Sequence, residues 1–183
     1  GITDLCLSLS AKPTQAYPEE LNVRIGANGL EELSALPEAD TVVVAIVGAA
    51  ALQPTMSAIR AGKKVVLANK ECLVLGGKFI MEAVSRSKSI LIPADSEHNA
   101  VFQCLEGAAE KEFSSIVLTA SGGPFRDLTP EEMEKVTPEL ALRHPNWSMG
   151  PKITIDSATM ANKGLELIEA KWLFGANTEQ LEV

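Results

Sequence analysis

Residues 41–47 read T-V-V-V-A-I-V, and Gly48 follows them directly. A β-branched apolar run of this length is typical of a strand that is buried on both faces of a parallel sheet. Two further short strands are expected at residues 64–67 and 89–93, and helical segments at residues 50–61 and 78–87 precede them. The alternation of strand and helix predicts βαβ units with right-handed crossovers, and therefore an α/β fold.

Composition excludes several classes of partner. The 183 residues carry a formal net charge of −8, which argues against nucleic acid or an acidic membrane surface as the main partner. No apolar run approaches the roughly 18 residues that a membrane-spanning helix needs. The three cysteines, Cys6, Cys72 and Cys104, have unrelated spacings. They indicate thiols in a reducing compartment rather than a disulfide framework or a zinc site.

Polar residues follow the second and third predicted strands, as A-N-K-E at 68–71 and A-D-S-E-H at 94–98. Ligands bind α/β sheets at the carboxyl ends of the strands. Asp95 and Glu97 are two residues apart, so they point the same way in an extended segment. Their oxygens suit a hard divalent cation. Alternatively, Asp95 caps the next helix, expected from His98 onward, and Glu97 lies in its first turn, where the helix dipole favours carboxylates.

The stretch at 144–169 is expected to form a polar loop (144–150), a strand (152–156) and a helix capped by Ser157. Helical spacing predicts an apolar face of Ala161, Leu165, Ile168 and Trp172, with polar side chains opposite, namely Asn162, Lys163, Glu166 and Glu169. Three of these polar residues, Asn162, Lys163 and Glu166, are spaced so that they can address one point. The alternative is an ordinary amphipathic helix with a solvated charged face.

Glu166 would be a third carboxylate beside Asp95 and Glu97, and a cation is a physical reason to gather three of them. Hydroxyl, amide and ammonium donors suited to phosphate are also present, at Ser121, Ser157, Asn162 and Lys163. Ser121 follows a predicted strand at 113–119, and the two glycines after it allow backbone amides to face an anion. His144 lies in a loop with Trp147 and Met149, which suggests an adaptable flap, although a lone histidine is more often structural.

Five stretches together closely resemble the 1-deoxy-D-xylulose 5-phosphate reductoisomerase family. They are A-I-V-G-A-A, L-A-N-K-E, P-A-D-S-E-H-N-A-V-F-Q, L-T-A-S-G-G-P-F-R and H-P-N-W-S-M-G-P-K-I-T-I-D-S-A-T-M-A-N-K-G-L-E-L-I-E-A. They come in the family's order, and the match is dense between residues 41 and 175. Five long motifs in order are far more specific than any single fingerprint.

The resemblance implies an enzyme of the non-mevalonate isoprenoid pathway. Family members rearrange 1-deoxy-D-xylulose 5-phosphate and reduce the product with NADPH to 2-C-methyl-D-erythritol 4-phosphate, using Mn²⁺, Mg²⁺ or Co²⁺. The implied fold is the remainder of a Rossmann-like parallel-sheet NADPH domain (1–93) followed by an α/β catalytic, or connective, domain (94–183). The implied full-length parent is a homodimer in the bacterial cytoplasm or plastid stroma, with a sugar phosphate substrate and neither nucleic acid nor membrane as partner.

Matching the family's motifs residue by residue implies the roles of individual side chains. The implied metal ligands are Asp95, Glu97 and Glu166. The implied substrate contacts are Lys70, Ser96, Glu97, Ser121, His144, Ser157, Asn162, Lys163 and Glu166. The implied cofactor contacts are Asn69, Glu71 and Gly150. The implied catalytic residues are Lys70, Glu97, His144 and Glu166, and the loop with Trp147 and Met149 resembles the family's flap.

The family's Gly-rich nucleotide loop and its C-terminal helical domain have no counterpart in these residues. The sequence is therefore expected to be a central fragment, with the full activity belonging to a longer parent. The first alternative is a truncated, non-catalytic module that binds a metal and a sugar phosphate. The second is another metal-dependent sugar-phosphate enzyme, such as an aldolase or a phosphatase.

Overall fold

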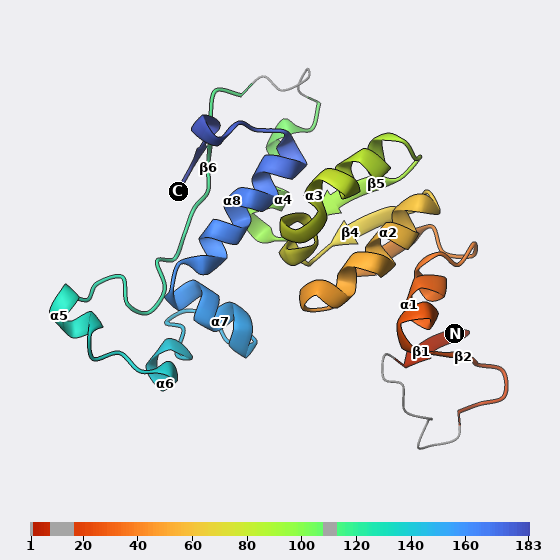
Figure 1. Cartoon of the computed structure of the whole chain (residues 1–183), viewed down its shortest axis with the longest axis horizontal. Coiled ribbons are helices and arrows are strands. Elements are labelled where there is room, and N and C mark those ends of the chain that lie inside the picture. The colour runs from red at the N-terminus through yellow and green to blue at the C-terminus, as the bar shows by residue number, and fades with distance from the viewer. Residues whose placement is uncertain (1, 8–16, 108–112) are drawn as a thin grey trace. The chain divides into compact units, whose positions relative to one another are not determined.

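The computed structural model describes residues 2–7, 17–107 and 113–183. Helices alternate with parallel strands along the chain (Figure 1), which confirms the predicted α/β class. The chain forms two compact units, Gly1–Phe102 and Gln103–Val183. Each unit is described by itself below.

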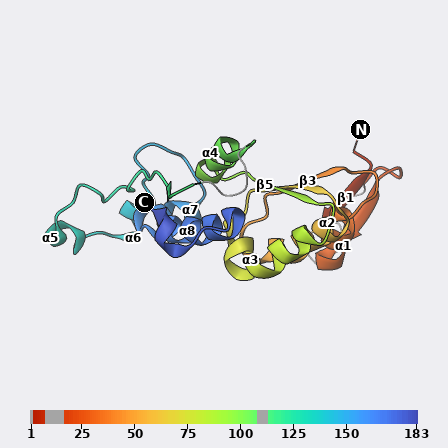
Figure 2. The ribbon, with the colours of Figure 1, turned by 90° about the horizontal axis from the view of Figure 1, so that it is seen from above.

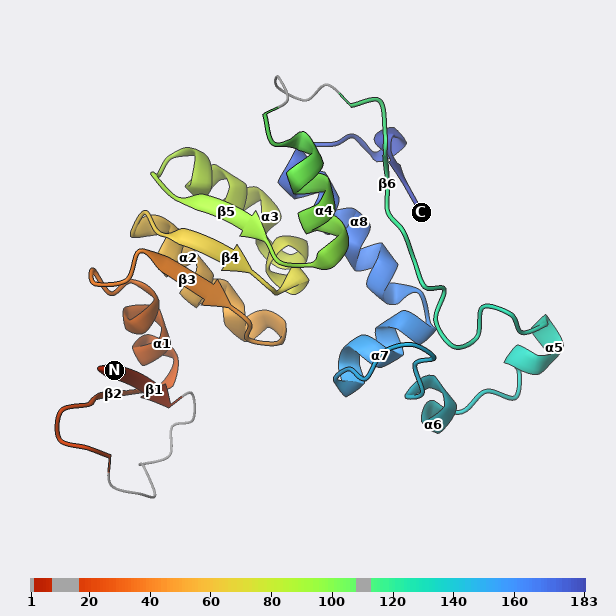
Figure 3. The ribbon, with the colours of Figure 1, turned by 180° about the vertical axis from the view of Figure 1, so that it is seen from behind.

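The first unit is built on three neighbouring parallel strands, β3 (Thr41–Val44), β4 (Lys64–Leu67) and β5 (Ile90–Pro93), in the order β3-β4-β5 (Figure 3). Helices lie on one side of these strands (Figure 2), and the side chains on that face are buried. On the opposite face Val43 is 66% exposed and Ile90 is 53% exposed. The expectation that residues 41–47 are buried on both faces is therefore wrong, and the strand ends at Val44.

The helices of this unit are α2 (Leu52–Arg60), preceded by the 3₁₀ turn η1 (Gly48–Ala51), and α3 (Lys70–Ser85). The helix predicted at 78–87 is only the second half of α3. It begins earlier because the side chain of Asn69 accepts a hydrogen bond from the backbone N–H of Cys72 at 2.7 Å. Gly76 leaves helical geometry, with φ −134°, and divides α3 at a kink. The next helix, α4 (Ser96–Leu105), also begins earlier than expected.

The N-terminal part of this unit pairs β1 (Asp4–Leu7) with β2 (Asn22–Ile25) in parallel, and α1 (Gly26–Ser34) follows. Arg24 donates to Asp4 across the pair at 2.6 Å, and this hydrogen bond lowers the pKa of the Asp4 carboxyl. After α1, the buried ammonium of Lys63 donates to the carbonyls of Leu36 and Ala39 at 2.5 and 2.6 Å. Lys63 therefore ties the segment that follows α1 to the start of β4.

The second unit pairs two short parallel strands, β6 (Ile116–Val117) and β7 (Leu181–Glu182), the latter after the 3₁₀ turn η2 (Thr178–Gln180). Two short helices, α5 (Pro130–Met133) and α6 (Pro138–Ala141), lie on the connection that leads from β6 to α7 (Figure 3). Each begins with a proline after a threonine whose side chain accepts from a helix N–H. The longer helices of the unit are α7 (Pro151–Ala158) and α8 (Ala161–Phe174).

The strand predicted at residues 152–156 is wrong, because these residues form α7. Pro151 occupies the first helical position, and the carbonyl of Gly150 accepts from both the N–H and the hydroxyl of Thr154, at 3.2 and 2.8 Å. The buried residues Thr154 and Ala158 are four apart, which is a helical rather than a strand period. Ser157 lies in the last turn of α7, so its predicted role as the cap of the next helix is also wrong.

The helix α8 buries most of its charged side chains. Its buried residues are Lys163, Glu166, Glu169, Ala170 and Phe174. Ile168, on the predicted apolar face, is 40% exposed. Helical spacing identified the two faces, but the charged one is the buried one. The interpretation as an ordinary amphipathic helix with a solvated charged face is therefore excluded.

The structure places α7 and the turn after Ser121 in close contact. Gly123 has φ +70°, and a Cβ built on it would lie 2.6 Å from the carbonyl oxygen of Ser157. Only glycine fits such a position without strain. Among the residues that the structure describes, no helix is long and apolar enough to cross a membrane.

We expect Lys63→Met to lower the free energy of unfolding of the first unit by about 2 kcal/mol, because two partly buried carbonyls lose their charged donor. Methionine retains most of the aliphatic stem, so the loss reports the ammonium. Urea denaturation followed by circular dichroism measures the effect. The control is Lys64→Met at the exposed neighbouring position, which should change stability by less than about 0.5 kcal/mol. Equal stability of the two variants would contradict the assigned role of Lys63.

We expect Gly123→Ala to destabilise the second unit by at least about 2 kcal/mol. Alanine is strained in the left-handed conformation of this residue, and its Cβ would clash with the carbonyl oxygen of Ser157. The control is Gly164→Ala inside α8, where, apart from the adjoining residues and the backbone of the helix itself, no described atom lies within 4 Å of the Cβ position. That variant should raise stability by about 0.5–1 kcal/mol through helix propensity. Thermal unfolding measures both, and a stable Gly123→Ala variant would show that the close approach is absent.

Candidate active site

In the first unit, Lys70 and Asp95 meet at the carboxyl ends of β4 and β5. The Lys70 ammonium lies 2.6 Å from Oδ2 of Asp95, and the two side chains are 11% and 18% exposed. Lys70 is the first residue of α3, and Asp95 lies two residues beyond the end of β5. The paired strands β4 and β5, in register from Lys64 and Ile90 to Leu67 and Pro93, bring these two loops to the same edge of the sheet.

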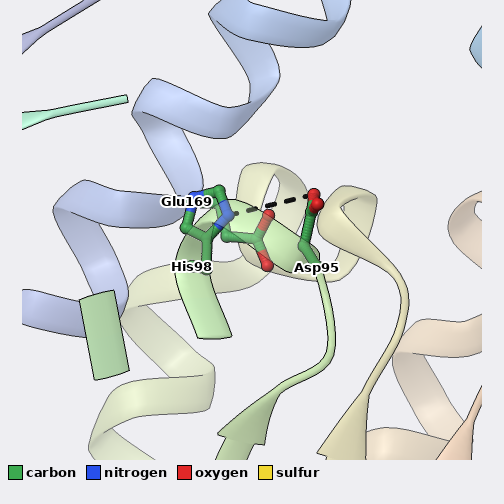
Figure 4. Close-up of side chains that lie close together, drawn as sticks. All are labelled: Asp95, His98 and Glu169. Carbon is green, nitrogen blue, oxygen red and sulfur yellow. Dashed lines mark ion pairs between the residues drawn. The ribbon is translucent and has the colours of Figure 1, made fainter. Parts of the chain in front are cut away.

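Two carboxylates gather at the same edge. An oxygen of Asp95 and an oxygen of Glu97 lie within 4.8 Å of each other, and the hydroxyl of Ser96 donates to Glu97 at 2.6 Å. Figure 4 shows the imidazole of His98 facing Asp95, with Nδ1 3.9 Å from Oδ2. His98 is fully buried near the start of α4. Two carboxylates this close fit a hard divalent cation by the chemistry of their donors.

Asn69 uses its whole side-chain amide on the protein backbone. Its Nδ2 donates to the carbonyls of Ile46 and Gly48 at 2.6 and 3.1 Å, while its oxygen accepts from Cys72. The side chain is 4% exposed. Asn69 therefore joins the segment that follows β3 to the start of α3, where Lys70 and Glu71 form the first turn.

In the second unit, three residues of α8 converge, as their spacing indicated. Asn162 donates to Oε1 of Glu166 at 2.5 Å, and the Lys163 ammonium pairs with Oε2 of the same carboxylate. Lys163 also donates to the carbonyl of Thr119 at 2.5 Å. Glu166 is 1% exposed, so its charge is removed from water and is compensated by these donors.

Ser121 and His144 lie together in the same unit. Oγ of Ser121 is 3.2 Å from Nε2 of His144, and Nδ1 accepts from the backbone N–H groups of Asn146 and Trp147 at 3.2 and 3.1 Å. An acceptor Nδ1 requires a neutral imidazole with its proton on Nε2, which then donates to Ser121. The Ser121 hydroxyl also accepts from the N–H of Gly123, so its own proton is available for a ligand.

Other predicted residues occupy less enclosed positions. Gly150 precedes α7 and is exposed, and Trp147 in the loop at 144–150 is 66% exposed. Ser157 contributes its carbonyl to the contact with Gly123. Arg126 donates to the carbonyl of Ser121 at 2.9 Å and so supports the turn.

Sequence reasoning missed two buried titratable side chains. His98 was not given a role beside Asp95, although a spacing of three residues at a helix start allows the approach. Glu169 was placed on the polar face of the helix and given no role, although it is 1% exposed. The sequence did contain a signal for this: Glu169 follows Glu166 by three residues, so both side chains lie on the same face of α8.

Two family models match the chain. One, described as 1-deoxy-D-xylulose 5-phosphate reductoisomerase, covers residues 6–77, and the other, described as the C-terminal domain of that enzyme, covers residues 91–174. The 1-deoxy-D-xylulose 5-phosphate reductoisomerase of Pelotomaculum thermopropionicum is 58% identical over 158 residues, covering 86% of this chain and 41% of the relative. That of Pseudomonas fluorescens is 57% identical over 166 residues, covering 88% of this chain and 42% of the relative. The chain thus spans about two fifths of the length of these relatives.

Solved structures agree. A crystal structure of DOX-P reductoisomerase in complex with NADPH, fosmidomycin and magnesium has a TM-score of 0.84 and 44% identity, over 90% of this chain and 43% of the other. The reductoisomerase of Zymomonas mobilis in complex with NADPH has a TM-score of 0.80 and 48% identity, over 88% of this chain and 41% of the other. These similarities confirm the predicted Rossmann-like α/β arrangement. Because both halves match one family in order, this chain belongs to the 1-deoxy-D-xylulose 5-phosphate reductoisomerase family.

Proposed function

We propose that this chain carries metal- and substrate-binding residues of an enzyme that converts 1-deoxy-D-xylulose 5-phosphate to 2-C-methyl-D-erythritol 4-phosphate with NADPH. The observation that carries the proposal is the meeting of Lys70, Asp95 and Glu97 at one sheet edge, in a chain of this family. Because the chain spans about two fifths of its relatives' length, the full reaction is proposed for a protein of that length. Its homodimeric state and bacterial cytoplasmic location are part of the same proposal, and the bacterial relatives support the latter.

We propose Asp95, Glu97 and Glu166 as the ligands of Mg²⁺, Mn²⁺ or Co²⁺. All three supply hard oxygen donors, and the hydrogen bond from Ser96 orients Glu97. A bound cation would polarise the carbonyl and hydroxyl oxygens of the substrate as a Lewis acid. Asn162 and Lys163 hold both oxygens of Glu166 in fixed positions, which supports its role as a pre-oriented ligand.

We propose that the substrate phosphate is bound by Ser121, Ser157, Asn162 and Lys163. His144 and Gly123 both donate to the hydroxyl oxygen of Ser121 and leave its proton for an anionic oxygen. Ser96, Lys70 and His144 are proposed contacts to the rest of the substrate, and the Lys70 ammonium would stabilise negative charge that develops on a substrate oxygen. The exposed loop at 144–150 would close over the bound molecule and exclude water.

NADPH would supply the hydride, and the protein would position it. Asn69, Glu71 and Gly150 are the proposed cofactor contacts. The functional boundary near residue 93, between an NADPH-binding part (1–93) and a catalytic part (94–183), also stays a proposal. The family model for the C-terminal domain begins at residue 91, close to that boundary.

We expect Glu97→Gln and Glu166→Gln each to weaken Mn²⁺ binding at least about tenfold, the factor that even outer-shell partners of a metal typically contribute. Glutamine keeps the shape of the side chain and removes the charge. Isothermal titration of this chain measures the dissociation constants. The control is the exposed Glu134→Gln, which should leave them unchanged. Mn²⁺ binding that is indifferent to both Glu97 and Glu166 would refute the proposed ligand set.

We expect 1-deoxy-D-xylulose 5-phosphate to bind in the presence of Mn²⁺, and Ser121→Ala to weaken that binding about tenfold to a hundredfold through loss of one hydrogen bond to a charged group. The matched control is the exposed Ser115→Ala, which should bind as the unchanged chain does. Titration calorimetry provides the readout.

The same samples are then mixed with NADPH and followed at 340 nm. Oxidation that yields 2-C-methyl-D-erythritol 4-phosphate would show that this chain suffices for the reaction. Substrate binding without oxidation would favour the non-catalytic module for the chain by itself. Failure of the substrate to bind would remove the support for the substrate site.

A further inference from the structure

The ion pair between Lys70 and Asp95 involves a carboxylate that is also a proposed metal ligand. The ammonium lies 2.6 Å from Oδ2, and both side chains are largely buried. A positive charge therefore already occupies one oxygen of Asp95 in the metal-free protein.

The backbone around Lys70 is fixed by the fold. Asn69, directly before it, is held by the carbonyls of Ile46 and Gly48 and caps α3 through Cys72. Asp95 follows β5, which is hydrogen-bonded to β4 in parallel register. The meeting of this ammonium and this carboxylate is thus set by three neighbouring strand ends rather than by a chance surface rotamer.

The Lys70 ammonium offsets an electrostatic repulsion between two carboxylates. Asp95 and Glu97 present oxygens within 4.8 Å of each other, and two partly buried carboxylates at that distance repel. A cation is needed to offset the repulsion, and Lys70 supplies one from within the chain. A divalent ion would satisfy the same oxygens more strongly than a single ammonium.

We propose that the Lys70 ammonium is an internal stand-in for the divalent cation: it holds Asp95 in the metal-free protein and is displaced from that oxygen when the metal binds. The inference rests on the proposed metal site and extends it. Two cations on one carboxylate oxygen repel, so each disfavours the other. When a metal binds, the Lys70 ammonium would leave Asp95 and turn toward the substrate. Metal binding would thereby make Lys70 available to contact the substrate.

The test is the Mn²⁺ affinity of Lys70→Met without substrate or NADPH, measured by isothermal titration at fixed ionic strength. Removal of the competing charge should tighten Mn²⁺ binding about fivefold or more. Lys70→Arg keeps the charge and should stay within about twofold of the unchanged chain, since a guanidinium can also pair with Asp95. Lys64→Met, on the same strand but at the exposed amino end, is the control for loss of one positive charge.

A spectroscopic readout follows the ammonium itself. The Lys70 side-chain ¹H–¹⁵N signal should be protected from solvent exchange in the metal-free chain and should lose that protection on titration with diamagnetic Mg²⁺. Thermal unfolding should show Lys70→Met destabilised without metal, because Asp95 loses its partner, and restored by Mn²⁺ through binding to the folded state.

The outcomes separate this inference from the function on which it rests. If Mn²⁺ binding depends on Glu97 but is equal or weaker in Lys70→Met, the stand-in role is overturned while the metal site stands. If neither the unchanged chain nor Lys70→Met binds Mn²⁺, both the proposed metal site and the stand-in role of Lys70 are refuted. If Lys70→Met alone binds detectably, the competition is supported directly. An ammonium signal that is unaffected by saturating Mg²⁺ would also overturn the proposal.

Discussion

The site depends first on the side-chain amide of Asn69. Its two N–H groups bond the carbonyls of Ile46 and Gly48, and its oxygen caps α3. One neutral side chain thereby fixes the loop after β3 and the helix after β4. The amide is buried and satisfied by the backbone, which is the condition under which a polar group can rigidify a core rather than weaken it. Lys70 takes its position from this arrangement, and β5, paired with β4, places Asp95 beside it.

In the second unit, α8 buries charged side chains. Lys163 and Glu166 are 6% and 1% exposed, and unpaired charges in such positions would be strongly destabilising. The helical spacing of Asn162, Lys163 and Glu166 supplies the pairing within one and a half turns, and the carbonyl of Thr119 takes a further ammonium proton. The charged side chains, whose burial costs the most free energy, are therefore the ones that hydrogen bonds and an ion pair hold in fixed positions.

Much of the fold, and the places where polar residues follow the strands, could be predicted from the sequence. The strand that begins at Thr41, the strand at 64–67 and the polar strand ends were predicted correctly, because a parallel sheet imposes a simple pattern and a common edge. The segment K-I-T-I-D was misassigned because its alternation imitates a strand, whereas Pro151 and the carbonyl of Gly150 start a helix. The exposure of α8 could not be inferred, because periodicity distinguishes two faces of a helix but does not decide which one is covered.

The errors are informative because of where they fall. Local rules expect a charged helix face to be solvated and an apolar one to be buried, and natural proteins depart from such rules mainly at functional sites. In α8 the departure coincides with Glu166 and Lys163, two residues that the family motif assigns to the metal and the substrate. A purely structural helix would gain nothing from exposing Ile168 while burying Glu166 and Glu169. The inverted burial of α8 therefore adds a structural argument for the roles proposed for Glu166 and Lys163.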